Sequence, residues 1–352
     1  MMKNKIIQTI RSRQEAFISY AEYMAFALYD EKEGYYMVNR DKVGKSGDFL
    51  TTPTTFSVFA EIMAKYFLSY VRQSLIPPIF YEIGGGTGHF AKAFLESVKN
   101  LGQLENIQYY SIEKSIYHKR LIKEKTNSYN VIVLDSINDL KELNGFIFSN
   151  ELFDAFPVHV IEKKDGNLYE VVIAEEDGDL YEQIIPLNNK DIHHYLEKFC
   201  ITMFEGQRIE VPLEALSLYQ CLTQKLHSGY VVTIDYGYTF EELKHPSRKD
   251  GSLRGYKNHQ MIHHVLKNPG EIDITYHVPF DAFIQVGEEK GLSTIDFLRQ
   301  DEFLLKIGIL DELSNHSEKD PFSLVSKRNR AIRSLIMPGS MSQFFHVLIQ
   351  SK

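Results

Sequence analysis

The chain has 352 residues, of which 43% are hydrophobic, 12% aromatic and 24% charged, so wholesale disorder and a coiled coil are poor interpretations. The 39 Lys and Arg residues against 47 Asp and Glu residues give a net charge of −8, which argues against a general nucleic-acid binder because phosphate contacts need clustered basic side chains. Two cysteines, Cys200 and Cys221, are too few for a disulfide scaffold or a thiolate zinc site.

The N-terminal residues lack the continuous apolar stretch of a secretory signal, and no run of about 18 apolar residues predicts a membrane span. The first eleven residues are amphipathic and basic, as in a transit peptide, but the acidic residues from Glu15 onward argue against one. The low cysteine count makes a reducing cytoplasm the predicted location.

The first elements in the chain are helical. Residues 5–29 predict a helix, in which Ser19 and Glu22 have the spacing of a capping box. A polar stretch rich in Gly and Thr covers residues 41–53, and a second helix is predicted over about residues 55–73.

Strands and helices then alternate. Apolar runs predict strands over residues 79–83, 107–112, 131–134 and 145–150, with helices over residues 89–99 and 114–126 between them. Such alternation indicates a parallel sheet with helices on both faces.

Residues 157–212 break this alternation. Two strands over residues 169–174 and 180–185 flank Asp177-Gly178, a hairpin turn signal, and a short helix follows near residues 190–204. We therefore expect an inserted antiparallel ribbon. The α/β pattern resumes with a helix, two strands and a final strand, over residues 213–227, 230–234, 293–298 and 344–350.

The sharpest local signal is a glycine turn after the first strand. Gly84, Gly86 and Gly88 follow the strand, and glycine permits a tight turn and close approach of a ligand. A dinucleotide site has the spacing G-x-G-x-x-G, but here the third glycine comes one residue early and His89 takes its place. With Glu82 just before the turn, these features favour a ligand without phosphate and with a positive centre, S-adenosylmethionine (SAM). We assign the turn residues to its binding: Glu82, Gly84, Gly86, Thr87 and Gly88. The alternative is a turn that binds no ligand.

Acidic residues follow the next two strands. Glu113 comes 25 positions after Gly88, where a carboxylate accepts hydrogen bonds from ribose hydroxyls. Asp135 and Ser136 follow the third strand, where an adenine amino group would lie. The alternatives are a solvated carboxylate for Glu113 and a helix cap for Asp135-Ser136.

A polar and aromatic segment, residues 149–157, follows the fourth strand. Its Asn150, Glu151 and Asp154 alternate with apolar residues and suit a pocket for a cationic, partly apolar group. A carboxylate here could hold a guanidinium in a bidentate pair and aim its nitrogen at a methyl donor. The alternative is a helix start capped by Asn150, which is compatible with a site.

Seven motifs, in order, resemble the MidA family of SAM-dependent methyltransferases. In mitochondria this family supplies a respiratory complex I assembly factor that dimethylates an arginine of a partner subunit. The resemblance runs from about residue 15 to the C-terminus and rests on Gly34-Tyr35-Tyr36, Gly47-Asp48-Phe49-Leu50-Thr51-Thr52-Pro53, Glu82-Ile83-Gly84-Gly85-Gly86-Thr87-Gly88, Ser149-Asn150-Glu151-Leu152-Phe153-Asp154-Ala155, Ile234-Asp235-Tyr236-Gly237, Gly251-Ser252-Leu253-Arg254-Gly255-Tyr256 with His259, and Asp273-Ile274-Thr275-Tyr276-His277-Val278.

The resemblance implies a class I, Rossmann-like α/β methyltransferase fold with a seven-stranded, mostly parallel sheet whose last strand is antiparallel. It also implies an N-terminal helical cap and lid loop over residues 1–75, and a core over residues 76–352 that carries the insertion at about 157–212. Asp48 lies on the loop expected to close over the cofactor. Asn150 and Asp154 are assigned to cofactor binding.

The implied acceptor is an arginine of a protein substrate, with Glu151 as the residue that grips it. A second carboxylate is usual in such sites, and Glu170 or Asp235 could serve. Tyr236 could face the transferred methyl group or be a buried tyrosine. No metal is predicted, because the histidines lack carboxylate partners at ligand spacing. The oligomeric state stays open, a dimer included.

Two other functions compete with a protein arginine methyltransferase. One is a non-catalytic assembly factor that keeps the fold and binds SAM. The other is an NAD-binding oxidoreductase, which the glycine spacing disfavours.

Overall fold

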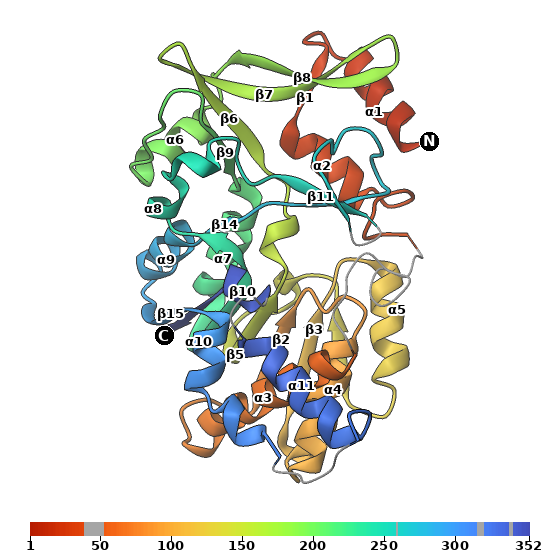
Figure 1. Cartoon of the computed structure of the whole chain (residues 1–352), viewed down its shortest axis with the longest axis vertical. Helices are drawn as coiled ribbons and strands as arrows, with labels where there is room; N and C mark the ends of the chain where they lie inside the picture. The colour runs from red at the N-terminus through yellow and green to blue at the C-terminus, as the bar shows by residue number, and fades with distance from the viewer. Residues whose placement is uncertain (39–52, 258–259, 315–319, 338–340) are drawn as a thin grey trace.

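The structure is a computed structural model, and it describes residues 1–38, 53–257, 260–314, 320–337 and 341–352. Figure 1 shows a lower part built around a large sheet and an upper part built around a second sheet. The helices are α1 (Met2–Arg11), α2 (Tyr20–Tyr29), α3 (Pro53–Arg72), α4 (His89–Asn100), α5 (Ile116–Lys125), α6 (Lys190–Lys198), α7 (Leu213–Lys225), α8 (Phe240–Leu243), α9 (Phe280–Glu289), α10 (Gln300–Lys306) and α11 (Leu324–Ile336). Short 3-10 turns are η1 (Leu104–Asn106), η2 (Ile137–Asp139), η3 (Phe153–Ala155), η4 (Pro246–Arg248), η5 (Ile309–Glu312) and η6 (Met341–Phe344).

The main sheet has the strand order β15-β16-β10-β5-β2-β3-β4, and the short β14 pairs with the end of β10. Strands β10, β5, β2, β3 and β4 are parallel, whereas β16 is antiparallel to both of its neighbours. With β14, eight described strands form the sheet, where seven were predicted. These strands are β2 (Ile79–Ile83), β3 (Gln108–Ile112), β4 (Val131–Leu134), β5 (Leu143–Asn150), β10 (Leu226–Tyr238), β14 (Val278–Pro279), β15 (Ser293–Arg299) and β16 (Phe345–Ser351).

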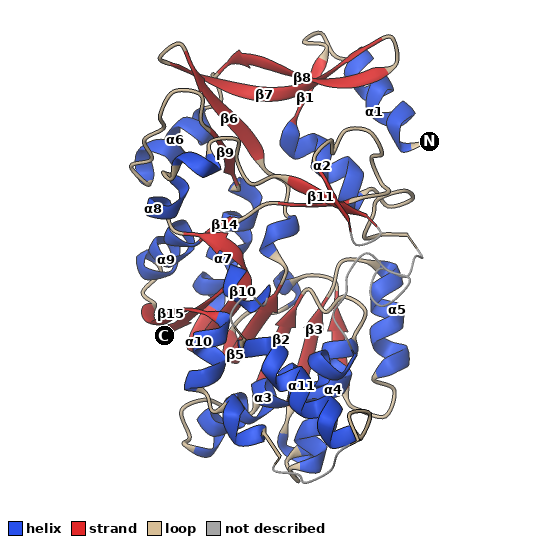
Figure 2. Cartoon of the chain, in the orientation of Figure 1, coloured by secondary structure: helices blue, strands red, loops and turns tan. Residues whose placement is uncertain are grey.

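Helices cover both faces of this sheet, which explains why its central strands are continuous apolar runs. On one face, α3, α4 and α11 pack over a cluster of buried aromatic rings that includes Phe67, Phe80 and Phe146. On the other face, α7 and α9 pack through Tyr219 and Phe283, whose ring centroids lie 4.9 Å apart. Figure 2 shows α3, α4 and α11 gathered in the lower part of the molecule.

The second sheet has the order β1-β7-β6-β9, with β8 paired to β7. Its strands β7 and β8 are joined through Asp177 and Gly178, at the turn that the sequence predicted. The strands are β1 (Phe17–Ser19), β6 (His159–Lys164), β7 (Asn167–Glu176), β8 (Asp179–Pro186) and β9 (Arg208–Val211). A third sheet joins β12 (Gln260–Ile262), β11 (Arg254–Lys257) and β13 (Asp273–Thr275).

The predicted single helix over residues 5–29 is wrong, because β1 separates α1 from α2. Residues Phe17–Ser19 pair antiparallel with β7, more than 150 positions later in the chain. This tertiary pairing overrides the local helical pattern. Ser19 nevertheless caps α2 through a capping box with Glu22, as its spacing indicated. Figure 1 shows α1 and α2 beside β7 and β8 at the top of the molecule.

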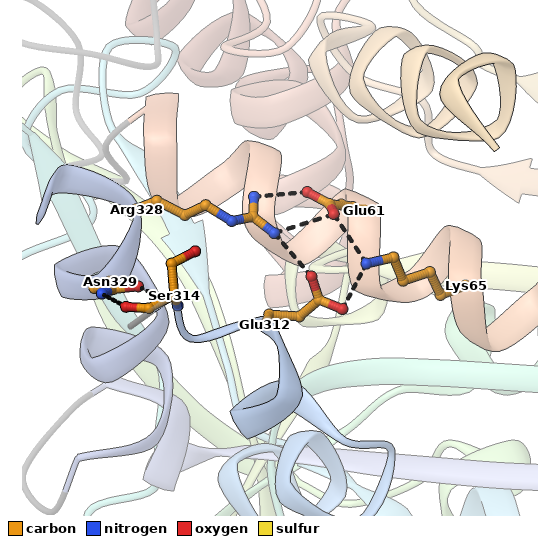
Figure 3. Close-up of polar contacts among 6 residues, drawn as sticks. All are labelled: Glu61, Lys65, Glu312, Ser314, Arg328 and Asn329. Atoms are coloured by element: carbon orange, nitrogen blue, oxygen red, sulfur yellow. Dashed lines mark hydrogen bonds and ion pairs between the residues drawn. The ribbon is translucent and has the colours of Figure 1, made fainter. Parts of the chain in front are cut away.

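A closed ring of four charged side chains joins α3 to the C-terminal part of the chain (Figure 3). Arg328 on α11 makes a bidentate pair with Glu61 on α3, at 2.7 and 3.0 Å, and a third contact with Glu312 at 2.9 Å. Lys65 contacts both carboxylates, which completes the ring. Since all four side chains are partly shielded from water, this ring fixes α3 and α11 against each other.

Within the described residues, no helix has the length and apolar character needed to cross a membrane.

Candidate functional site

The candidate site is a cleft at the edge of the main sheet where the parallel strands end, as expected for an open α/β sheet. Two adjoining hollows of about 210 Å³ and about 350 Å³ form this cleft. They share six lining residues, Tyr36, Ile83, Gly84, Gly86, His118 and Glu151. Most of the residues that the sequence assigned to the site line one or both hollows.

The glycine turn after β2 forms the floor of the cleft. Gly84, Gly86 and Gly88 have φ values of +78°, +51° and +74°, a region that favours glycine. A Cβ atom on Gly86 would meet only the carbonyl oxygen of Gly84, at 4.0 Å, whereas one on Gly88 would lie 2.8 Å from Ile122 Cα. Gly86 therefore faces open space, and Gly88 allows α4 and α5 to pack closely. Thr87 lines the smaller hollow.

Glu113 connects the glycine turn to the start of α5. Its carboxylate accepts the backbone N–H of Gly86 at 2.8 Å and that of Ser115 at 2.8 Å. The side chain lines the larger hollow and lies 3.8 Å from Nδ1 of His118. A carboxylate has about four acceptor positions, so Glu113 can hold the turn and still accept bonds from ligand hydroxyls.

Glu82 lies beneath the turn and is only 4% exposed. It accepts hydrogen bonds from the hydroxyls of Tyr109, at 3.0 Å, and Ser111, at 3.3 Å. Burial raises the pKa of its carboxyl to about 8, although the two hydroxyls oppose this shift. Because Glu82 also lines the smaller hollow, a cationic group bound there would restore its charge.

Asp135 and Ser136 lie at the outer rim of the larger hollow. The carboxylate of Asp135 is largely exposed and pairs with Lys119 on α5. The hydroxyl of Ser136 accepts the N–H of Asn138 at 3.1 Å and caps η2. The cap that the sequence offered as an alternative is therefore present, and it leaves both residues on the cleft wall.

Glu151 lies where the two hollows meet, and it is the first residue after β5. Its φ of +49° is unusual for a residue with a side chain, and such strain often marks a functional position. The N–H of Glu151 donates to the carbonyl of Ile234 at 3.0 Å, and its carboxylate accepts from Nδ2 of Asn150 at 3.2 Å. Glu151 is exposed to the cleft, but the protein around it reduces its solvation. This desolvation raises the pKa of its carboxyl, and the hydrogen bond from Asn150 opposes the shift.

Asp235 lies behind this segment and is fully buried. One of its carboxylate oxygens accepts three consecutive backbone N–H groups, of Leu152 at 3.2 Å, Phe153 at 2.8 Å and Asp154 at 3.3 Å. The other accepts the N–H of Tyr236 at 2.9 Å. Asp235 lines neither hollow, so its carboxylate holds the chain after Glu151 rather than facing the cleft.

Asp154 and Asp273 bring further negative charge to the smaller hollow. Asp154 is 4% exposed, and burial, together with the charges of Asp235 and Glu151, raises its pKa well above the usual range. Asp273 accepts a hydrogen bond from the hydroxyl of Tyr36 at 2.6 Å. The cleft therefore favours a ligand that carries positive charge.

The remaining predicted residues lie apart from the hollows. Tyr236 lines neither hollow, and its ring packs on Phe345 with centroids 3.8 Å apart. Burial and then the charge of Glu151 raise the pKa of its hydroxyl. Tyr236 follows Ile234 by two residues, and the carbonyl of Ile234 accepts the N–H of Glu151. Glu170 pairs with His159 at 2.7 Å in the second sheet and lines a different hollow. Asp48 lies outside the described residues.

Two tyrosines form a wall of the cleft that sequence reasoning did not assign. The rings of Tyr29 and Tyr36 stack with centroids 5.6 Å apart and an interplanar angle of 25°, and both line the larger hollow. Tyr29 also donates to the carbonyl of Ala155 at 2.9 Å, which ties α2 to the segment after Glu151. The only signal was the motif Gly34-Tyr35-Tyr36, which suggested a family but no position in the site.

These groups fit SAM better than a dinucleotide. The open face of Gly86 allows close approach of a ligand, and Glu113 retains acceptor capacity. Glu82, Glu113, Glu151, Asp154 and Asp273 all line the cleft. A bound sulfonium or ammonium group would stabilise the ionised form of these carboxyls, whereas a pyrophosphate would disfavour it. In the described part of the chain, no three His, Cys, Asp or Glu side chains gather as a metal site requires.

Comparisons with known proteins agree with this fit. The family described as "Putative S-adenosyl-L-methionine-dependent methyltransferase" matches residues 62–298. A crystal structure of a COG1565 superfamily member from Burkholderia thailandensis, bound to S-adenosyl-homocysteine, superimposes with a TM-score of 0.88 and 25% identity, covering 100% of this chain and 92% of that one. A native crystal structure from the same organism gives a TM-score of 0.85 and 26% identity, over 100% of this chain and 92% of that chain.

Curated relatives match across nearly the whole chain. A protein from Xenopus tropicalis is 26% identical over an alignment of 385 positions that covers 99% of this chain and 86% of the relative. One from Rattus norvegicus is 27% identical over an alignment of 368 positions that covers 94% of this chain and 80% of the relative. Both carry the name protein arginine methyltransferase NDUFAF7, mitochondrial.

These names overturn the predicted cytoplasmic location. The relatives are named as mitochondrial proteins. The prediction rested on the low cysteine count, which indicates only a reducing compartment and does not say which one.

The family match covers most of the chain, and the cofactor product in the Burkholderia structure agrees with the glycine turn and the acidic cleft. The family match and the bound product decide against an NAD-binding oxidoreductase, and the cofactor is SAM. The chain belongs to the MidA-like family of class I, SAM-dependent α/β methyltransferases.

Proposed function

We propose that this methyltransferase transfers the methyl group to a side-chain nitrogen of an arginine in a protein. The observation that carries the proposal is the position of Glu151. Its carboxylate lies where the two hollows of the cleft meet, on a residue whose backbone has a strained, positive φ. The relatives' names, which specify arginine methylation, support the same acceptor. A protein acceptor also suits a chain with a net charge of −8 better than a nucleic acid does.

The cleft residues divide into two groups for the cofactor. Gly84, Gly86, Thr87 and Gly88 form the turn that a ligand can approach, and Glu113 would accept from ribose hydroxyls while Asp135 and Ser136 border the adenine position. Glu82, Asn150 and Asp154 line the smaller hollow and would hold the charged amino-acid part. Asp48 completes the predicted set. When bound, SAM supplies a methyl group on a positively charged sulfur that is already activated toward a nitrogen nucleophile.

Glu151 would bind the acceptor guanidinium through both carboxylate oxygens. The surroundings raise the pKa of the Glu151 carboxyl and so favour its neutral form. A guanidinium beside it would act against this shift and hold the carboxyl in its charged form. That pairing orients the attacking nitrogen and localises charge on the guanidinium, and the carboxylate can take up the proton late in the reaction. Asp235 acts through Glu151 as a positioning residue, and Tyr236 flanks the acceptor side.

We also propose a division of the chain around this site. Residues 1–75 were predicted as a cap with a lid loop, residues 76–352 as the core, and about 157–212 as its insertion. Here α1 and α2 pack on the sheet of the insertion, so they form the cap together with it. Helix α3 packs on α4 and α11, and we count it with the core.

The test is methyl transfer from SAM with a deuterated methyl group into proteins of a cell extract, with the labelled sites located by mass spectrometry. We expect labelled methylarginine, and a loss of about 100-fold or more for Glu151→Gln with unchanged cofactor affinity. Label on lysine, or on small molecules only, would overturn the arginine assignment. No label in any fraction would instead support the alternative of a non-catalytic SAM-binding assembly factor.

A further inference from the structure

A cationic and aromatic surface lies next to Tyr236, near the end of β10. It consists of Arg248, Arg254, Tyr238 and His277, and we call it the arginine patch. The guanidinium of Arg248 lies 3.8 Å from the centroid of the Tyr238 ring, a close cation–π contact. The Tyr238 ring in turn meets His277 edge-on, with centroids 4.4 Å apart.

Arg254 belongs to the same surface. It lies opposite Thr275 of β13, two residues before His277, and it donates to the carbonyl of Ser252, whose hydroxyl accepts the N–H of His277. Burial lowers the pKa of His277 to about 3, and the positive charges of Arg254 and Arg248 add to this effect. His277 is therefore neutral at physiological pH, and the two arginines supply the charge of the patch.

Tyr236 connects the patch to the cleft. Its ring is nearly parallel to that of His277, with centroids 6.3 Å apart and an angle of 12°. Tyr236 is also near Glu151, whose N–H bonds to Ile234 two residues earlier in β10. An acceptor whose arginine reaches Glu151 would thus extend past Tyr236 toward the patch.

The two arginines keep donors for a ligand. In the described part of the chain neither forms an ion pair, whereas Arg11, Arg13, Arg208 and Arg328 all pair with carboxylates. Arg248 donates to the carbonyl of Glu242 at 2.8 Å, and Arg254 to that of Ser252 at 3.0 Å. Since a guanidinium has five N–H donors, several remain on each group.

The patch is held rigidly by a buried carboxylate. Glu210 is 8% exposed and accepts from the N–H and hydroxyl of Ser252, both at 2.8 Å, and from the N–H of Leu253 at 3.1 Å. The hydroxyl of Ser252 accepts the N–H of His277 at 2.9 Å. This network fixes the backbone on both sides of the patch, so that binding costs little reorganisation.

We propose that the arginine patch binds an acidic side chain, Glu or Asp, that lies near the target arginine in the acceptor protein. This inference deepens the proposed function and rests on it. The acceptor would then be recognised by two opposite charges, its arginine at the acidic cleft and its carboxylate at the patch. Guanidinium groups suit a carboxylate because they bind it in a bidentate manner. Such complementary charges fix the orientation of the bound segment.

The experiment uses the full chain and the acceptor protein isolated by the labelling described above. Steady-state kinetics compare the native enzyme with the variant Arg248→Gln/Arg254→Gln, and the native acceptor with variants in which each acidic residue near the methylated arginine becomes its amide. We expect the enzyme variant to raise KM about tenfold or more, as loss of a charge-assisted pair does, with kcat nearly unchanged. One amide variant of the acceptor should raise KM similarly for the native enzyme but not for the enzyme variant Arg248→Gln/Arg254→Gln. Arg120→Gln, which removes an exposed arginine on α5, is the matched control and should change nothing.

An unchanged KM in a folded Arg248→Gln/Arg254→Gln variant, or additive effects of the enzyme and acceptor substitutions, would overturn the proposal. If the double variant does not fold, Arg254→Gln alone serves, because Arg254 takes no part in the ring stack, and Arg254→Lys should recover part of the affinity. Absence of any methylated arginine would be a failure of the proposed function, whereas methylation insensitive to the patch would be a failure of this inference alone.

Discussion

Asp235 accepts the backbone N–H of Phe153 at 2.8 Å, two residues after Glu151. The same carboxylate oxygen accepts the N–H groups of the residues on either side, so one buried side chain holds the segment that carries the candidate acceptor-binding carboxylate. The two residues are 82 positions apart in sequence and meet because β5 and β10 are neighbours in the sheet.

The variant Asp235→Asn tests this arrangement. An amide can keep an acceptor toward the three N–H groups only by turning its NH₂ group toward the N–H of Tyr236, so one donor is left facing another. We expect a loss of about 1–3 kcal/mol in the free energy of unfolding, and a drop in kcat of about 100-fold as Glu151 moves out of position. Cofactor affinity, measured by calorimetry, should change little. Asp281→Asn, which weakens a carboxylate contact to the N–H of Phe240, is the control and should cost stability but not turnover. Full turnover by Asp235→Asn would contradict the positioning role.

The backbone strain at Glu151 predicts opposite effects on stability and activity. Because Glu151 has a φ of +49°, Glu151→Gly should raise the free energy of unfolding by about 1 kcal/mol. The same change should abolish methyl transfer, because the acceptor-binding carboxylate is lost. Asp177→Gly is a matched control, since Asp177 also has a φ of +49° but lies in the hairpin between β7 and β8. It should gain similar stability and keep its activity. A Glu151→Gly variant that remains active would remove Glu151 from the site.

Alanine variants of Gly86 and Gly102 separate the effect of backbone strain on stability from the effect of an added Cβ atom on cofactor binding. Both have positive φ, and a Cβ on either meets no atom closer than 4.0 Å, so Gly86→Ala and Gly102→Ala should each cost about 1 kcal/mol of stability. Only Gly86 faces the cleft, and we therefore expect Gly86→Ala alone to weaken cofactor binding, by about tenfold or more for a blocked approach. Titration calorimetry with SAM measures this difference. Equal affinities for the two variants would contradict the cofactor position.

The raised pKa of Glu82 predicts a pH-dependent affinity. Since burial raises this pKa to about 8, the carboxyl is mostly protonated at pH 6, and binding of a cationic ligand must displace the proton. Affinity for SAM should rise by up to about tenfold per pH unit between about pH 6 and 7, where most of the ligand's own amino group stays protonated. Calorimetry in two buffers of different ionisation enthalpy should show proton release on binding.

Glu82→Gln should remove both the slope and the proton release. The same linkage acts on folding. A carboxyl whose pKa is raised in the folded state stabilises the fold fully below its unfolded pKa, near 4.5, and this contribution is lost as the pH rises to about 8. The variant should therefore be the more stable protein above pH 8 and lose this advantage below pH 5. A native affinity that is flat with pH would refute the assignment.

The charged ring in Figure 3 predicts a coupling between α3 and α11. A double-mutant cycle with Glu61→Gln and Arg328→Gln should give a coupling energy of about 1 kcal/mol, because the pair is bidentate and partly shielded. Turnover should stay unchanged, since none of the four ring residues lines the cleft. A coupling energy near zero in urea denaturation would show that water screens the pair completely.

Local patterns determined much of this protein from its sequence. Apolar runs predicted the parallel strands, and the Asp177-Gly178 turn signal predicted the hairpin, because backbone propensities and turn residues act over a few positions. The antiparallel last strand was expected only from the resemblance to the family. The glycine spacing with Glu82 and Glu113 indicated the cofactor for the same reason, since turn, helix start and strand end lie close together in the chain.

Tertiary structure alone decided which carboxylates face the cleft. Asp235 and Glu170 were equal candidates for a second acceptor-gripping residue, yet one is buried under the segment after Glu151 and the other pairs with His159 in the second sheet. Likewise, β1 interrupts the predicted first helix because its partner β7 lies far along the chain. The wall formed by Tyr29 and Tyr36 depends on how α2 is placed over the sheet edge. Each of these outcomes depends on contacts between residues that are distant in sequence. Local sequence patterns do not predict the free energies of such contacts.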